Sequence, residues 1–227
     1  MSNLILISTS LTAILALTLG FFSLIKNPKS LVVRSWFWFS LAIVVWCAGY
    51  IGTILAINEI GALHSLRFVY IGAALIPVLF FNFVINFLNV NKKYQTIFAA
   101  GFVLAAVFIG LSVFSNYLIQ GVKFHGNFGY FEDVNNYGFI PFLIYFFFLT
   151  FWAVYLLIIN FNSSDGIKRK QTGYIILASV FGFIGGTTNF VMDLTGMFPY
   201  GQLVVWLYPV FITYGIFVDE IKIKIKF

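Results

Sequence analysis

The sequence contains few charged residues and few of the side chains that usually carry catalysis or bind metals. Of its 227 residues, 9% are charged, two are histidines and one, Cys47, is a cysteine. A lone cysteine excludes a disulfide framework and a thiolate metal cluster. The sequence also lacks an HExxH motif, a GxSxG motif and a phosphate-binding glycine loop. We therefore expect no catalytic residue, no metal site, no cofactor and no enzymatic activity.

The scarcity of charge also excludes a water-soluble domain, in which about 25% of the residues are charged. Hydrophobic residues make up 61% of the chain and aromatic residues 21%. A membrane-spanning helix needs about 20 mostly apolar residues, and polar or helix-breaking segments divide the chain into stretches of this kind. We expect an all-α membrane protein that folds as a seven-transmembrane helix bundle. The expected spans are Leu4–Ile25, Val33–Ile57, Leu63–Leu88, Tyr94–Phe114, Phe139–Phe161, Gly173–Leu194 and Gln202–Val218.

The basic residues favour one side of the expected membrane. The net charge is +6, but the basic side chains lie in short segments between apolar runs, which is typical of a topology signal and not of a nucleic-acid groove. Only Arg67 and Lys123 fall on the opposite side from all the others. By the positive-inside rule, the amino terminus is outside and the carboxyl terminus is cytoplasmic. We expect a multi-pass protein of a bacterial or archaeal inner membrane, with the lipid bilayer as a partner and no nucleic acid. The basic residues on the cytoplasmic side are Lys26, Lys29, Arg34, Lys92, Lys93, Lys168, Arg169, Lys170, Lys222, Lys224 and Lys226.

The longest connection, Ser115–Gly138, is expected outside. It contains the sequence VKFHGNFGYFEDV, in which a His-Gly-Asn turn lies between partly alternating segments. This pattern predicts a small β-hairpin between the fourth and fifth spans. Such a hairpin is either a lid over the bundle or part of the mouth of a ligand site.

Small and polar residues follow one face of the sixth span. Ala178, Gly182, Gly186, Asn189 and Asp193 recur at spacings of three and four, so they share a helix face. Because small residues let helices approach closely in lipid, we expect Gly182 and Gly186 to pack against a neighbouring helix. Asn189 and Asp193 then line a polar cavity near the outer side. Alternatively, Asp193 is simply hydrated at the interface and Asn189 holds helices together.

The third span begins outside with His64 and Arg67, which lie one turn apart. Arg67 does not follow the topology signal, so we expect it to pair with Asp193 or Glu59. The alternative for Arg67 is a side chain that reaches up to the lipid headgroups. His64 alone is more typical of a hydrated interfacial residue than of a ligand.

Trp46 and Tyr50 lie one turn apart within the second span. They either stack on a ligand or pack within the bundle. The predicted ligand-binding residues are therefore Arg67, Asn189, Asp193, Trp46, Tyr50 and His64.

The order of several local segments resembles a known family. These segments are WFWFSLAIVVWCAGYIG in the second span, Leu66-Arg67-Phe68 to Phe80-Phe81 in the third, and Lys168-Arg169-Lys170-Gln171, IGGTTNF, FPYG and Tyr214-Gly215-Ile216 further on. Together they resemble the amino-terminal seven-helix region of bacterial and archaeal membrane histidine kinases. The resemblance implies a receptor in which an outer or membrane-embedded cue changes the helix packing and the seventh span passes the change inward. It supplies no ligand-binding residues.

This resemblance divides the chain into a seven-helix transmembrane sensor domain, residues 1–220, and a short cytoplasmic tail, residues 221–227. The tail sequence IKIKIKF alternates strictly, which favours a strand. No phosphoacceptor helix or ATP-binding domain follows, so we expect a cytoplasmic signalling effector in cis or in trans. An unknown small ligand and a homodimer are the other expected partners.

Two other functions fit the sequence. A small transporter or channel would need a continuous polar path, for which Arg67 and Asp193 supply outer polarity and Asn82 and Asn86 supply inner polarity. A structural subunit of a larger membrane complex is the third reading.

Overall fold

A computed structural model describes residues 2–125, 129–195 and 199–224, without the side chains of residues 2, 125, 191–195 and 220–224. The described chain is helical apart from one two-stranded antiparallel sheet. The elements are α1 (Ser2–Lys26), α2 (Leu31–Ile54), α3 (Glu59–Phe87), α4 (Asn91–Phe114), β1 (Ile119–His125), β2 (Gly129–Val134), α5 (Asn136–Ser163), α6 (Gly166–Ser179), the π-helical η1 (Val180–Ile184), α7 (Gly185–Thr195), the 3₁₀-helical η2 (Tyr200–Val204) and α8 (Leu207–Lys224).

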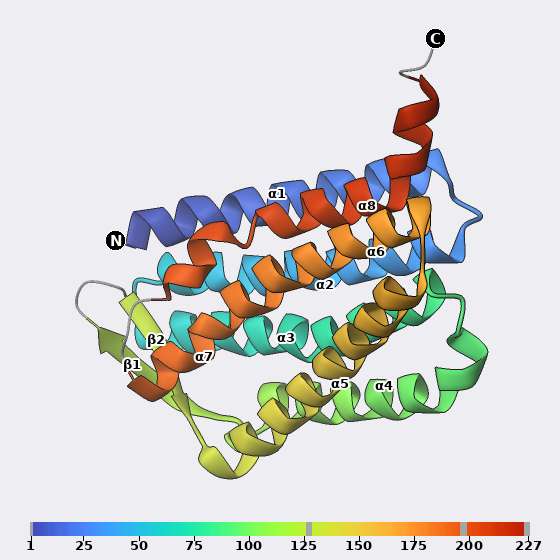
Figure 1. Ribbon diagram of the computed structural model, residues 1–227. Helices are drawn as coiled ribbons and strands as arrows, with labels where there is room; N and C mark the ends of the chain where they lie inside the picture. Colours follow the sequence, from blue (N-terminus) through green and yellow to red (C-terminus); the bar gives the residue numbers. More distant parts are fainter. Residues whose placement is uncertain (1, 126–128, 196–198, 225–227) are drawn as a thin grey trace.

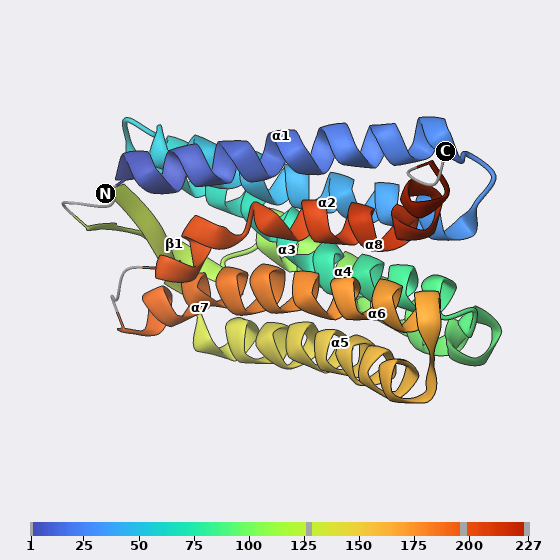
Figure 2. The same cartoon turned by 45° about the horizontal axis from the view of Figure 1, so that its top comes forward.

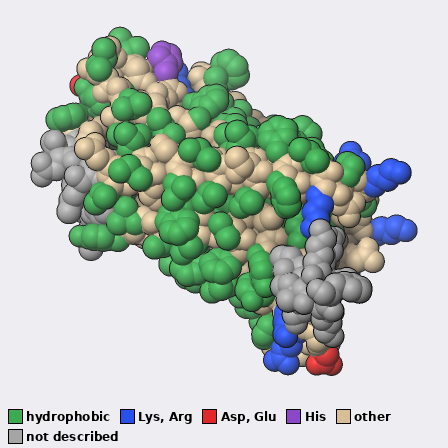
Figure 3. Space-filling view, turned by 90° about the horizontal axis from the view of Figure 1, so that it is seen from above, with side chains coloured by type: hydrophobic (Ala, Val, Ile, Leu, Met, Phe, Trp, Pro, Cys, Tyr) green, Lys and Arg blue, Asp and Glu red, His purple; other side chains and the backbone are tan. Residues whose placement is uncertain are grey.

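The helices lie side by side in one bundle, and successive helices run in opposite directions (Figures 1 and 2). One end of the bundle, here called the hairpin end, carries the amino terminus and the sheet β1–β2. The other end, here called the basic end, carries the connections α1–α2, α3–α4 and α5–α6 and the carboxyl terminus. Lys and Arg side chains gather at the basic end, whereas most of the visible side of the bundle is hydrophobic (Figure 3).

Capping residues explain where several helices begin. The Asn58 side chain accepts a hydrogen bond from the backbone N–H of Gly61 at 2.8 Å, and the Asn135 side chain accepts one from Tyr137 at 3.1 Å. Ser30 caps α2 in the same way through Val33. Asn and Ser at these positions satisfy amide groups that have no partner within the helix. The polar breaks between apolar runs are therefore helix starts.

Within the described residues, six helices are long and apolar enough to cross a membrane: α1 to α5, and the continuous run of α6, η1 and α7 from Gly166 to Phe190. The predicted seventh span, Gln202–Val218, is instead divided into η2 and α8, and the apolar part of α8 is the shorter helix Leu207–Asp219. Pro209 does not interrupt α8, because it lies in its first turn, where backbone N–H groups have no partner in the helix.

The strand predicted for the tail is wrong for residues 221–224, because α8 continues as a helix to Lys224, and residues 225–227 lie outside the described residues. An isolated strand leaves its backbone groups unpaired, whereas each residue added to an existing helix gains a backbone hydrogen bond. The predicted hairpin is confirmed: β1 and β2 pair from Ile119 opposite Val134 to His125 opposite Gly129. Strand β2 lies against α2, α3 and α7 at the hairpin end.

The most extensive helix packing joins α2 and α3. Gly49 of α2 permits it, because a Cβ at Gly49 would lie 2.8 Å from the Cα of Val69. The fully buried rings of Trp36 and Phe39 on α2 and of Phe80 on α3 pack on one another. The closely packed pair α2–α3 is thus the part of the bundle against which the other elements pack.

Candidate functional site

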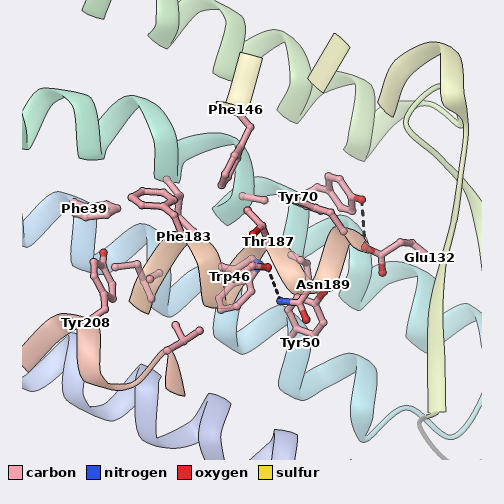
Figure 4. Close-up of a pocket in the computed structure, with 18 residues that line it drawn as sticks. Phe39, Trp46, Tyr50, Tyr70, Glu132, Phe146, Phe183, Thr187, Asn189 and Tyr208 are labelled. Atoms are coloured by element: carbon pink, nitrogen blue, oxygen red, sulfur yellow. Dashed lines mark hydrogen bonds between the residues drawn. The ribbon is translucent and has the colours of Figure 1, made fainter. Parts of the chain in front are cut away.

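A cavity lies between α2, α3, α5 and the segment η1–α7, with Glu132 of β2 and Tyr208 of α8 also in its lining (Figure 4). Its free space is about 50 Å³. Because about 10–15 Å³ measured in this way holds one water molecule, the cavity has room for only a few water-sized groups. Eight of its 18 described lining residues are aromatic: Phe39, Trp46, Tyr50, Tyr70, Phe146, Phe183, Phe190 and Tyr208.

The hairpin contributes a buried carboxylate to this cavity. Glu132 is 5% exposed, and the Tyr70 hydroxyl donates a hydrogen bond to its Oε1 at 3.3 Å (Figure 4). The next residue, Asp133, is partly exposed and forms an ion pair of 2.6 Å with Lys123 on β1. Adjacent carboxylates of one strand therefore have different environments, and only Glu132 lines the cavity.

A buried hydrogen-bond network runs from the cavity to α1. The Asn189 amide donates to Gln202 Oε1 at 3.0 Å, and Gln202 Nε2 donates to the Thr9 hydroxyl at 3.1 Å. The Ser8 hydroxyl donates to the Gln202 backbone carbonyl at 2.7 Å. All four residues are buried. The network therefore links α7, η2 and α1, and Asn189 belongs both to it and to the cavity lining.

The π-helical segment η1 interrupts the helix that carries Asn189. Gly182 and Phe183 of η1 line the cavity. A π-helical turn contains one residue more than an α-helical turn and is frequent at functional sites. The extra residue shifts the face that α7 presents, so η1 determines which side chains of α7 reach the cavity.

The glycines of this segment have separate roles. A Cβ at Gly182 would lie 3.0 Å from the Tyr208 ring, so Gly182 packs against α8. A Cβ at Gly186 would meet no atom within 4 Å, because Gly186 faces the cavity. The close backbone approach lies instead at Gly185, where a Cβ would lie 2.7 Å from the Gly201 carbonyl oxygen. The spacing argument that paired Gly182 with Gly186 missed this one-residue offset, since the π-helical turn breaks the regular period.

Three of the predicted ligand-binding residues line the cavity together: Trp46, Tyr50 and Asn189. The rings of Trp46 and Tyr50 meet edge to face with centroids 5.0 Å apart, so they pack on each other and also face the cavity. Asp193 belongs to α7, but its side chain lies outside the described residues.

Arg67 and His64 are not among the described residues that line the cavity. The guanidinium of Arg67 donates to Asn116 Oδ1 at 3.0 Å, and the Arg67 carbonyl accepts a hydrogen bond from Ser112 of α4. Arg67 thus lies on the face of α3 that is turned toward α4. His64 is exposed.

Sequence reasoning missed Glu132, Tyr70 and Gln202. The alternation in the hairpin could have indicated that one of the neighbouring acids Glu132 and Asp133 faces the bundle. Gln202 offered a second signal, as an amide at the start of an apolar run. No three side chains of His, Cys, Asp or Glu lie close enough to hold a metal ion in the part of the chain that the structure describes.

The fold and the cavity define a multi-pass membrane protein with an internal aromatic site. Comparison with known families identifies the chain further: the model of the N-terminal 7TM region of histidine kinase matches residues 5–221. The chain belongs to this family. It is a membrane sensor module, and the lipid bilayer is its environment. None of the curated proteins matches the sequence.

Proposed function

We propose that the chain senses a small molecule in the aromatic cavity and relays its presence through α8 to a cytoplasmic effector such as a histidine kinase. In this proposal the chain binds and transmits, and it catalyses no reaction. The observation that carries the proposal is the composition of the cavity lining. Residues of the hairpin, of the closely packed pair α2–α3 and of the start of α8 line the same cavity.

The size of the cavity makes occupancy and helix packing interdependent. A cavity of about 150 Å³ is known to hold benzene, whereas this one offers about 50 Å³. A ligand of even that size must therefore widen the site. Because α2 and α3 pack closely, the movable wall is the segment of η1 and α7. A ligand that binds the widened packing more tightly than the narrow packing shifts the equilibrium toward the widened packing. The size of this shift is set by the difference between the two affinities.

A widening of the cavity would be transmitted to α8 through direct contacts. Asn189 lines the cavity and is hydrogen-bonded to Gln202 of η2. Immediately after η2, Val205 and Tyr208 also line the cavity. A displacement of α7 therefore acts on the start of α8 through both a hydrogen bond and side-chain contacts, and α8 ends at the basic end of the bundle (Figure 1).

We propose that the hairpin end faces the outside and the basic end faces the cytoplasm. The support is the positive-inside rule, applied to the Lys and Arg residues that gather at the basic end (Figure 3). In this orientation the cavity lies toward the outer side, and α8 delivers its movement to the cytoplasmic side, where an effector in cis or in trans would receive it.

The packing argues against the alternative of a channel or transporter. On the side of the cavity toward the basic end lie the fully buried rings of Trp36, Phe39 and Phe80, and Phe39 itself lines the cavity. The ring centroids of Trp36 and Phe39 are 5.9 Å apart, and those of Phe39 and Phe80 are 5.3 Å apart. This contiguous apolar layer would oppose the passage of a polar solute.

Backbone hydrogen exchange tests the proposal without a known ligand. Ala73 is 3% exposed and lines the cavity, so the ring of Ala73→Phe enters the free space and mimics occupancy. We expect faster exchange in η2 and α8, because the packing around them is widened. The matched control is Ala100→Phe, which adds the same ring at an exposed position of α4. Equal exchange of η2 and α8 in both variants would contradict the proposed relay.

A further inference from the structure

Tyr208 of α8 lines the cavity and carries a buried hydroxyl that no described residue pairs with. The residue is 3% exposed, and its hydroxyl forms no hydrogen bond with the described part of the chain. Thr150 and Thr213 carry such hydroxyls too, but neither lines the cavity. A buried hydroxyl normally has a partner, because it gives up its hydrogen bonds to water on folding. Tyr208 thus brings an unmet hydrogen-bonding group to the site.

Aromatic rings flank the Tyr208 side chain. The ring centroids of Phe39 and Trp36 lie 5.6 and 6.1 Å from that of Tyr208. In Figure 4 the hydroxyl is turned toward Phe39, at the opposite end of the cavity from Glu132, the one carboxylate of the described lining. A charged ligand group would cost far more to bury among these rings than an uncharged one. The group that pairs with Tyr208 is therefore uncharged.

This group is also a hydrogen-bond acceptor. A tyrosine hydroxyl can donate and accept, but its oxygen shares electrons with the ring, which makes it a better donor than acceptor. The complementary ligand atom is therefore an uncharged oxygen or nitrogen with a free lone pair.

The movable wall of the cavity lies against Tyr208. A Cβ at Gly182 of η1 would lie 3.0 Å from the Tyr208 ring. A ligand that displaces η1 and α7 therefore extends the free space along this ring toward the hydroxyl. The hydrogen bond to Tyr208 then forms only in the widened packing, and it supplies the difference in affinity that shifts the equilibrium.

From these observations we infer that the cavity binds a small, uncharged, mostly apolar compound with one hydrogen-bond acceptor, such as a carbonyl oxygen. The acceptor pairs with the Tyr208 hydroxyl, and the apolar body lies along Phe39 and Phe183, which line the cavity. This inference rests on the proposed function, since it names the class of ligand for the same site. It also brings the ligand into direct contact with α8.

Two probes of nearly equal shape test the role of the acceptor. Acetophenone carries a carbonyl oxygen, and α-methylstyrene has a CH₂ group in its place. Both are volatile, so headspace gas chromatography measures their uptake by nanodiscs that hold the full chain, with the uptake by empty nanodiscs subtracted. We expect saturable binding of acetophenone by the unsubstituted chain. The absence of such binding would overturn the ligand class.

Tyr208→Phe removes the hydroxyl and keeps the ring. We expect it to weaken the binding of acetophenone by about tenfold, as the loss of one buried hydrogen bond does, and to leave that of α-methylstyrene unchanged. The matched control is Tyr214→Phe on the same helix, at a position that is 38% exposed and outside the described lining; it should change neither affinity. Unchanged binding of acetophenone in Tyr208→Phe, or an equal loss for both probes, would overturn the inference.

The stability of Tyr208→Phe without a probe separates a ligand-binding role from a structural one. Removing a buried hydroxyl that has no partner removes no hydrogen bond from the folded chain. We therefore expect Tyr208→Phe to be at least as stable as the unsubstituted chain in denaturant unfolding. A loss of stability would mean that the hydroxyl is already paired in the folded protein, which would overturn the inference.

The two proposals fail separately. If acetophenone does not bind, or binds without the Tyr208 hydroxyl, the ligand class is refuted, whereas the relay is judged by the exchange experiment on Ala73→Phe, which uses no ligand. If the exchange experiment fails but acetophenone binds through Tyr208, the site stands and the relay does not.

Discussion

At the scale of single residues, the site depends on which atoms of α7 approach its neighbours and which face free space. Gly185 and Gly186 are adjacent in the chain but have opposite environments. Gly185 lies against the backbone of Gly201, and Gly186 faces the cavity. A side chain is thus excluded at one position and accommodated at the next, which makes this pair a sensitive test of the described packing.

We predict that Gly185→Ala destabilises the protein and that Gly186→Ala does not. The added Cβ of Gly185→Ala overlaps the Gly201 carbonyl and the Val205 side chain, and overpacking of this kind costs about 1–3 kcal/mol. Gly186→Ala meets no atom within 4 Å and gains about 0.5–1 kcal/mol from the better helix propensity of alanine. Denaturant unfolding in detergent measures both, and the reverse order of stability would show that the close approach is misassigned.

The residue scale also shows what the sequence could and could not predict about the site. Trp46 and Tyr50 were found from their helical spacing because α2 is regular there, and Asn189 was found from its spacing to Gly186, which lies on the same side of the π-helical turn. Arg67 was chosen for its unusual side of the membrane, but its partner Asn116 is an uncharged residue beyond the end of α4. Glu132 was missed because the face of a short hairpin that turns toward the bundle depends on tertiary packing.

At the scale of elements, η1 sets the rotation of α7 relative to α6. The local sequence pattern predicted the positions of α1 to α5, since polar breaks and capping residues mark the ends of several of them. It could not predict the π-helical turn at Val180–Ile184 or the division of the last span into η2 and α8. Both irregularities lie beside the cavity, where packing with neighbours outweighs the local pattern.

We predict that deleting Ile184 disconnects α7 from η2. Ile184 is 65% exposed, so its removal deletes little buried contact. The deletion restores an α-helical turn and rotates α7 by about 100°, which carries Asn189 away from Gln202. In a Cys47→Ala background, a short bifunctional thiol reagent should join Asn189→Cys to Gln202→Cys in the full-length chain and fail to join them after the deletion.

Ile184→Leu is the control for this experiment, because it changes the same side chain and keeps the chain length. We expect cross-linking to persist in it. Cross-linking that survives the deletion would mean that η1 does not set the orientation of α7.

At the scale of the whole molecule, the bundle separates the candidate site from the end of α8, the proposed output. The aromatic cavity and the hairpin lie toward one end, and the basic side chains and the last turns of α8 lie at the other (Figures 1 and 3). The sequence predicted this polarity correctly as a segregation of charge, because each basic cluster adjoins a break between apolar runs. A membrane sensor needs this separation, since the cue and the effector are in different places.

The most direct test of this account is the distance between α5 and α8 when the cavity is filled. Spin labels at Tyr155 of α5 and Val210 of α8, both exposed, report this distance by double electron–electron resonance in a Cys47→Ala background. We expect Ala73→Phe to shift the distance by about 1–2 Å, the scale of helix shifts in switching proteins. The control Ala100→Phe should leave the distance unchanged. Identical distance distributions in the filled, control and unsubstituted cavities would contradict the central claim that occupancy repositions α8.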